Sequence, residues 1–251
     1  MRQVPPPSAS PHTILHRGIV RHPSAILLVT QLLGVLVYPF TGDTVAGRVV
    51  FELFGALVLG LAIWSVRDSP GSTWLAVVLG VSASALSIAQ AVQGSDVLGL
   101  LSAVLHALFY LWAATSLMRY MLADVHITRD ELYAVGATFT LVAWAFAWAF
   151  SALQLLQPGS FTAAVSPESP RTWMELLFLS FTNLSSTGLS DVVPILPVAR
   201  SLVMIEQLAG VAYVAFFVSR VVGLTLNRER SSAPVPPPSQ EPVAAPADAR
   251  G

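Results

Sequence analysis

Residues 171–210 read RTWMELLFLSFTNLSSTGLSDVVPILPVARSLVMIEQLAG. This stretch joins a short apolar segment, a polar run and the start of a long apolar segment. Thr172 and Glu175 have the spacing of a capping box, so a helix is predicted to begin there. Only about 12 to 14 residues fit before the polar run 185–191, whereas crossing a hydrocarbon core takes about 20. A long apolar helix follows Pro197. Together these segments are typical of a re-entrant pore loop, because non-helical backbone at membrane depth must be buried in protein or face water.

The composition of the whole chain points the same way. Of its 251 residues, 54% are hydrophobic and 11% are charged, and the mean hydropathy is +0.68. These values indicate an integral membrane protein without a separate soluble domain. There is no cysteine, so disulfides, thiol catalysis and cysteine-based metal sites are excluded. A net charge of -1 gives no indication of a nucleic-acid partner, and none is expected.

The predicted fold class is an all-α membrane protein with six transmembrane helices, and with a re-entrant pore helix and filter loop between the fifth and sixth. The apolar stretches are 24–41, 46–66, 73–93, 97–121, 131–156 and 195–226. We expect four parts. They are a disordered cytoplasmic tail at 1–22, a four-helix membrane domain without voltage-sensing arginines at 23–123, a pore domain at 124–227 and a disordered, Pro- and Ala-rich cytoplasmic tail at 228–251.

Arginines gather on one side of this predicted topology. They precede the first span, lie between the second and third and between the fourth and fifth, and end the sixth. The positive-inside rule therefore predicts a multi-pass protein of the cell's inner (plasma) membrane with both termini in the cytoplasm and the filter mouth outside. The fourth span carries a single arginine, Arg119, at its cytoplasmic end. A voltage sensor needs several charges along one helix, so steep voltage dependence is not expected.

Polar residues inside the spans are interpreted as structural. Glu52 is expected to pair with Arg48 one turn away, and His106 to be a hydrogen-bonded histidine rather than a proton relay. The glutamines of the spans are expected to form interhelical hydrogen bonds. These glutamines are Gln31, Gln90 and Gln93.

The pore-loop segment FLSFTNLSSTGLSDVVPILPVARS resembles that of the tetrameric potassium-channel superfamily, whose filter usually reads T-V-G-Y-G-D. Segment 130–150 also resembles the outer helix of small bacterial members, so the resemblance covers about the last half of the chain before its tail. Aligned without gaps, the ion-conducting filter falls on Ser186, Thr187, Gly188, Leu189, Ser190 and Asp191. The resemblance implies a homotetramer, because one pore loop per chain cannot enclose a conduit. It also implies a gating-hinge glycine at Gly210, and it implies no cofactor beyond a permeant monovalent cation, K⁺ or Na⁺.

Two departures from the family pattern fall at the outer end of the filter. Rings of backbone carbonyls replace the hydration shell of the ion in such filters, and Ser186 can add an inner hydroxyl ring. Ser190 stands where the family has a glycine whose backbone conformation a Cβ resists. Leu189 cannot make the hydrogen bond of the family tyrosine, and Phe178 and Leu179 are apolar where a hydrogen-bonding cuff would serve. A softer filter with fewer carbonyl sites is predicted.

Asn183, Ser185 and Glu206 are candidates for support of the filter. Glu206 either faces water or hydrogen-bonds behind the filter to hydroxyls such as Ser185, Ser180 or Thr182, and the second role is favoured. Asn183 is expected to join that bracing network. Asp191 either forms a ring of carboxylates that attracts cations or caps the filter strand, and both interpretations stay open.

The favoured function is a cation channel, with passive conduction through a homotetrameric pore in the lipid bilayer and weak selectivity between potassium and sodium. The alternative is a non-conducting scaffold or regulatory subunit derived from such a channel. An enzyme is not expected, because the sequence has no nucleophile–base set, metal motif or phosphate loop. A secondary transporter is disfavoured because the two halves have no matching broken helices.

Overall fold

The computed structural model describes residues 22–40, 45–65, 73–123 and 129–232. The predictions made for residues 1–21 and 233–251 lie outside this part of the chain. The Arg48–Glu52 pair also lies outside the residues whose side chains are described.

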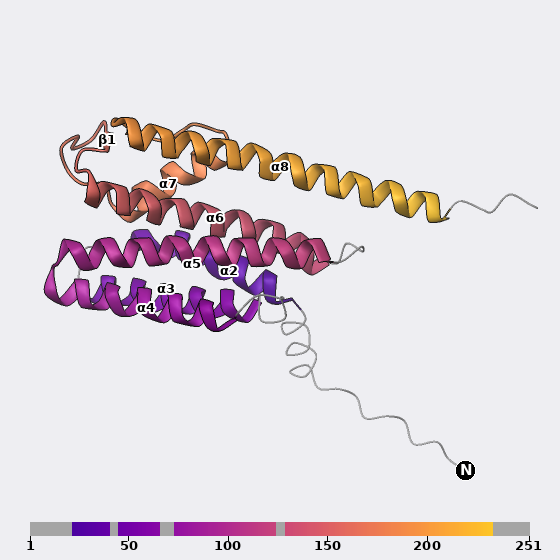
Figure 1. Cartoon of the computed structure of the whole chain (residues 1–251), viewed down its shortest axis with the longest axis horizontal. Coiled ribbons are helices and arrows are strands. Elements are labelled where there is room, and N and C mark those ends of the chain that lie inside the picture. The colour runs from indigo at the N-terminus through magenta and orange to yellow at the C-terminus, as the bar shows by residue number, and fades with distance from the viewer. Residues whose placement is uncertain (1–21, 41–44, 66–72, 124–128, 233–251) are drawn as a thin grey trace, which may run out of the picture.

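The structure is a bundle of long helices in which α8 extends beyond the others (Figure 1). The N-terminal elements are α2 (Pro23–Val37), the 3-10 turn η1 (Tyr38–Phe40), α3 (Val45–Ser65), α4 (Thr73–Gln93) and α5 (Asp96–Ala123). The C-terminal elements are α6 (Arg129–Leu156), β1 (Phe161–Ala163), α7 (Trp173–Leu184), β2 (Val192–Pro194) and α8 (Pro197–Ser232). Helix α5 packs along α6 and α4, while α2 packs against α6 and α3, so α6 joins the two halves of the molecule.

Among the described residues, five helices are long and apolar enough to cross a membrane. They are Pro23–Phe40, Trp74–Gln93, Asp96–Leu122, Asp130–Leu156 and Pro197–Arg220. The predicted second span corresponds to α3, whose described apolar part is the shorter segment Phe54–Trp64. The chain is therefore a mostly helical, multi-pass membrane protein. Helix α8 continues to Ser232, past the boundary of 227 predicted for the pore domain.

The contact between α5 and α6 combines small residues with aromatic ones, such as Tyr110 of α5 against Trp144 of α6. Ala113 and Ala114 on α5 and Ala134 and Ala137 on α6 are all buried in one apolar cluster. Alanines allow two membrane helices to approach closely, which favours a rigid contact between them. The N-terminal bundle is thus packed directly on the helix that precedes the short helix α7.

Two predictions about polar residues in the bundle have different outcomes. His106 is buried, and its Nδ1 lies 2.9 Å from the carbonyl oxygen of Ser102, to which it must donate because a carbonyl only accepts. Its ring stacks on Trp148 with centroids 4.3 Å apart, so the prediction of a hydrogen-bonded histidine is confirmed. The prediction for Gln31 is wrong. It is buried on α2, and neither side-chain polar atom has a partner among the described residues.

Candidate functional site

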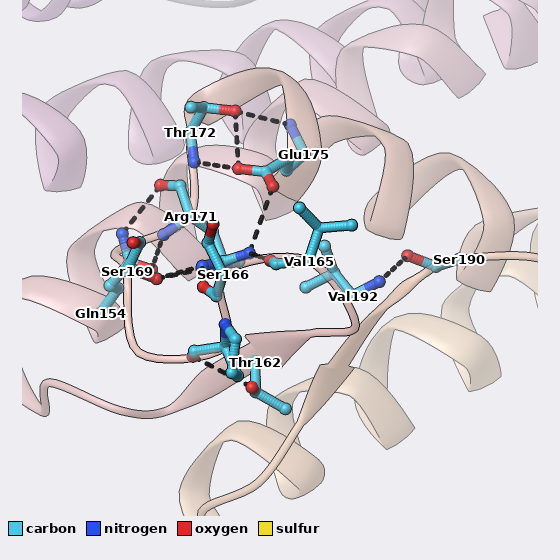
Figure 2. Close-up of polar contacts among 11 residues, drawn as sticks. Gln154, Thr162, Val165, Ser166, Ser169, Arg171, Thr172, Glu175, Ser190 and Val192 are labelled. Atoms are coloured by element: carbon cyan, nitrogen blue, oxygen red, sulfur yellow. Dashed lines mark hydrogen bonds and ion pairs between the residues drawn. The ribbon is translucent and has the colours of Figure 1, made fainter.

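The short helix α7 begins where the sequence predicts, because its first turn is capped locally. The Thr172 backbone N–H donates to Glu175 Oε2 at 2.6 Å, and the Glu175 backbone N–H donates to Thr172 Oγ1 at 3.3 Å (Figure 2). This reciprocal pair is the predicted capping box. Helix α7 has 12 residues, within the predicted range and too short to cross a bilayer of ordinary thickness.

Arg171 organises the loop before α7, which sequence reasoning did not predict. Its guanidinium is buried and donates to the carbonyl oxygens of Val165 (3.3 Å), Ser166 (2.5 Å) and Ser169, and it forms an ion pair with Glu175 at 3.3 Å. Figure 2 places the side chain at the centre of these contacts. Guanidinium presents five donors in a fixed fork, which suits a loop that exposes several carbonyls.

Gln154, near the end of α6, ties the outer helix to the start of α7. Its Oε1 accepts from the Arg171 backbone N–H at 2.7 Å, and its Nε2 donates to the Arg171 carbonyl at 3.0 Å. Two bonds to one residue fix both the distance and the rotation of the backbone there. The first turn of α7 is therefore positioned by α6 as well as by its own cap.

A small sheet holds the segment after the polar run. Strand β1 pairs antiparallel with β2, with Thr162 opposite Val193. The Ile195 backbone N–H continues the ladder by donating to the Ser160 carbonyl at 2.8 Å. Residues 192–195 are thereby joined to the loop that follows α6, so both ends of the polar run 185–191 are attached to the same scaffold.

The inner part of the polar run is hydrogen-bonded to one carbonyl oxygen near the end of α7. The backbone N–H groups of Thr187 and Gly188 both donate to the Thr182 carbonyl, at 2.9 and 3.1 Å. The Thr187 hydroxyl also points to this oxygen, at 3.3 Å. A trans peptide places its N–H and C=O on opposite sides. The carbonyls of Ser186 and Thr187 therefore point away from α7, toward the exposed side of the run.

The sign of the backbone angle φ alternates from residue to residue along the inner part of this segment. Ser186 and Gly188 have positive φ, 60° and 66°, whereas Thr187 and Leu189 do not. Alternation between right- and left-handed conformations aligns successive peptide groups. Ser190 breaks the alternation, since its φ is not positive, and its Oγ instead accepts from the Val192 backbone N–H at 3.1 Å. Ser190 therefore does not adopt the left-handed conformation that the family glycine position was expected to require.

The other outer residues of the run are exposed in the single chain. Leu189 is 78% exposed and has no hydrogen-bonding side chain. Asp191 is exposed and makes no side-chain hydrogen bond or ion pair to a described residue, and the cap on Val192 comes from Ser190. Leu179 is buried in an apolar cluster with Val192, whereas Phe178 is 46% exposed.

Glu206 is fully buried and contacts the helix that carries the polar run. Its Oε1 contacts the Ser180 hydroxyl, and its Oε2 accepts from Asn183 Nδ2 at 3.3 Å. The predicted contacts with Ser180 and Asn183 are therefore present. The predicted contacts of Glu206 with Ser185 and Thr182 are absent, because both hydroxyls contact backbone carbonyls of α7 instead. Ser185 Oγ lies 3.4 Å from the Thr182 carbonyl and 3.0 Å from Thr187 Oγ1, so it contacts the polar run directly.

Gly210 is the point of closest approach between α8 and α7. A Cβ at this position would lie 2.0 Å from the Leu184 carbonyl oxygen and 2.8 Å from its carbon. No side chain can occupy that space without moving backbone. Glu206 and Gly210 lie one turn apart and thus attach the N-terminal part of α8 to the end of α7.

The part of α8 after Gly210 is attached to α5 and α6. The Tyr213 hydroxyl donates to the Val135 carbonyl of α6 at 2.6 Å. Arg220 donates to the Met121 carbonyl of α5, and its guanidinium lies 4.0 Å from Glu131 Oε2. The polar side-chain contacts of α8 thus reach α7 before Gly210, and α5 and α6 after it.

These features define a multi-pass membrane protein in which a short capped helix and an irregular polar segment are inserted between its last two long helices. Residues 136–226, which run from α6 through α7 into α8, match the model of a family described as an ion channel. The match supports a place for this part of the chain in the potassium-channel-like ion channel superfamily. No curated protein and no solved structure gives a significant match to the chain.

Proposed function

We propose that the protein is a homotetrameric cation channel whose conducting filter is 186–191 and whose preference between potassium and sodium is weak. The observation that carries this proposal is the orientation of the Ser186 and Thr187 carbonyls, which point away from α7 because the next two N–H groups bond to Thr182. Four copies around an axis would present these oxygens as two rings. Carbonyl rings are the groups that replace the hydration shell of a permeant cation.

The outer end of the filter supports weak selectivity. Leu189 is exposed and has no hydroxyl to brace it, and Ser190 lacks the left-handed backbone of Ser186 and Gly188. The alternation that aligns the inner peptide groups therefore does not continue to the outer end. Selectivity depends on the number and constraint of the coordinating carbonyls, so two well-held rings discriminate less than a full set. Asp191, exposed at this end, would add a ring of carboxylates that attracts cations.

The membrane arrangement in this proposal follows the distribution of arginines. We place α7 and the filter as a re-entrant loop open to the outside of the plasma membrane, and α3 as the second of six spans. Both termini lie in the cytoplasm. The four-helix domain 23–123 surrounds a pore domain of 124–227, in which α6 and α8 face the axis. Each domain is attached to the pore of its own chain through the α5–α6 contact.

Gly210 is proposed as the gating hinge. The part of α8 before it is held to α7, while the part after it is held to α5 and α6 by Tyr213 and Arg220. A change of direction between the two anchored parts has to occur near their boundary. Glycine, which lacks a Cβ and is a weak helix former, tolerates such a change best.

The deciding experiment is the reversal potential of the purified protein in planar bilayers with potassium on one side and sodium on the other. We expect a value near zero for the wild type. Leu189→Tyr together with Ser190→Gly should move it toward the potassium equilibrium potential, and only in part, because Phe178 and Leu179 cannot supply hydrogen bonds. A wild-type value already at the potassium potential would contradict the proposed weak selectivity.

Conduction and assembly are tested separately. Mass measurement or cross-linking in detergent should give four copies, and only monomers would remove the conduit. Cation flux in liposomes should exceed that of protein-free vesicles. A tetramer without flux would favour the alternative, a non-conducting scaffold or regulatory subunit.

A further inference from the structure

Glu206 is a buried acid without an opposite charge near it. Its exposed fraction is 0%, and it forms no ion pair with any described residue. Of the arginines in the neighbouring segments, Arg171 is paired with Glu175, Arg200 donates to the Pro194 carbonyl, and Arg220 lies near Glu131. An ionised carboxylate in such surroundings would carry a large desolvation cost with no compensating cation.

The hydrogen bonds of Ser180 indicate whether Glu206 is ionised or protonated. Ser180 Oγ lies 2.8 Å from the Ala143 carbonyl of α6 and also contacts Glu206 Oε1. A hydroxyl has one hydrogen, and both of these oxygens would be acceptors if Glu206 were ionised. One of the two contacts would then join two acceptors with no hydrogen between them. The arrangement is satisfied if Glu206 carries the hydrogen, donates it to Ser180, and leaves the Ser180 hydrogen for Ala143.

The remaining contact fits the same assignment. Asn183 Nδ2 donates to Glu206 Oε2 at 3.3 Å, and Oε2 is the carbonyl oxygen of a protonated acid whose hydrogen is on Oε1. Both carboxyl oxygens of Glu206 and the Ser180 hydroxyl then have a partner of the correct kind. The chain of hydrogen bonds runs from α8 through α7 to α6.

We propose that Glu206 is a neutral carboxylic acid that donates its proton to Ser180 and so holds α7 between α6 and α8. The functional consequence rests on the proposed channel function. Ser180 and Asn183 stand on either side of Thr182, whose carbonyl receives the N–H groups of Thr187 and Gly188. Glu206 is therefore a positioning residue, because it acts on the filter through α7 and does not touch the ion.

Glu206→Gln is the informative substitution. A glutamine with its amide nitrogen toward Ser180 donates where the acid donates, and its oxygen accepts from Asn183, so all three hydrogen bonds are kept. Glu206→Ala removes them. We expect Glu206→Gln to keep the wild-type reversal potential and unfolding midpoint, and Glu206→Ala to shift the reversal potential and lower the midpoint by several degrees. If Glu206→Gln behaves like Glu206→Ala, the protonated assignment is wrong.

A spectroscopic measurement decides the protonation state without any ion current. The infrared difference spectrum of wild type minus Glu206→Gln, in lipid at pH 7, should contain the carbonyl band of a protonated carboxylic acid. The matched control is Glu175→Gln, which removes the carboxylate paired with Arg171 and should give no such band. A carboxylate band in the Glu206 difference would overturn the proposal. Absence of ion current in the wild type would count against the proposed channel function alone, since the infrared and unfolding results would still decide the state of Glu206.

Discussion

Gly210→Ala is the substitution whose effect follows most directly from the structure. The added Cβ would lie 2.0 Å from the Leu184 carbonyl oxygen. An ordinary carbon–oxygen contact is about 3.3 Å or longer, so α8 and the end of α7 must separate by roughly 1 Å or more. Overpacking of this kind typically costs about 1–3 kcal/mol. For a chain of this size each kcal/mol lowers the unfolding midpoint by about 2–4 °C, so a loss of about 2–12 °C is expected.

The matched control is Gly223→Ala on the same helix, where an added Cβ meets nothing within 4 Å. It should leave the midpoint unchanged or raise it slightly, because alanine is the better helix former. The assay is thermal unfolding in detergent, followed by single-channel conductance in bilayers. Displacement of Leu184 also moves Ser185 and the proposed filter that follows, so Gly210→Ala should lower the conductance as well. Equal midpoints for the two variants would refute the argument from close contact.

Three further predictions concern the rest of the chain. Arg119 supplies at most about one gating charge per subunit, worth about 2.3 kcal/mol per 100 mV, so currents that rise e-fold within a few millivolts would contradict the absence of a voltage sensor. Arg171→Ala should destabilise the protein by more than about 2 kcal/mol in thermal unfolding, because three carbonyls lose a charged donor. Arg171→Lys should recover only part of this loss, and full recovery would exclude a role for the fork geometry. Thr172→Ala should cost about 1 kcal/mol by loss of the cap, and an unchanged midpoint would contradict that contribution.

The local elements of the fold were the most accessible to prediction. The start of α7 follows from Thr172 and Glu175, which contact each other across three residues and need no distant partner. The long helices follow from runs of apolar residues whose length matches a bilayer. Their ends differ from prediction by a few residues, most at α8, because a helix leaving the apolar region is limited by propensity and not by hydropathy.

The pairing of the two strands and the partners of the buried polar residues could not be predicted from the sequence. Strands β1 and β2 have three residues each, too few for an alternating pattern to stand out, and they exist only because they pair with each other. The contact of Gln154 with Arg171 is likewise invisible in sequence, since it depends on how α6 ends relative to α7.

The sequence by itself determined that this is a membrane protein with a short capped helix, a polar run after that helix and a glycine in the last long helix, because each depends on neighbouring residues alone. Only the tertiary structure decided what the buried groups do. Glu206 could have met any of three hydroxyls, and the rotation of α8 against α7 selects Ser180. Gly210 is needed where it is because the two backbones meet there. Both results come from the relative placement of helices, which packing over the whole molecule determines.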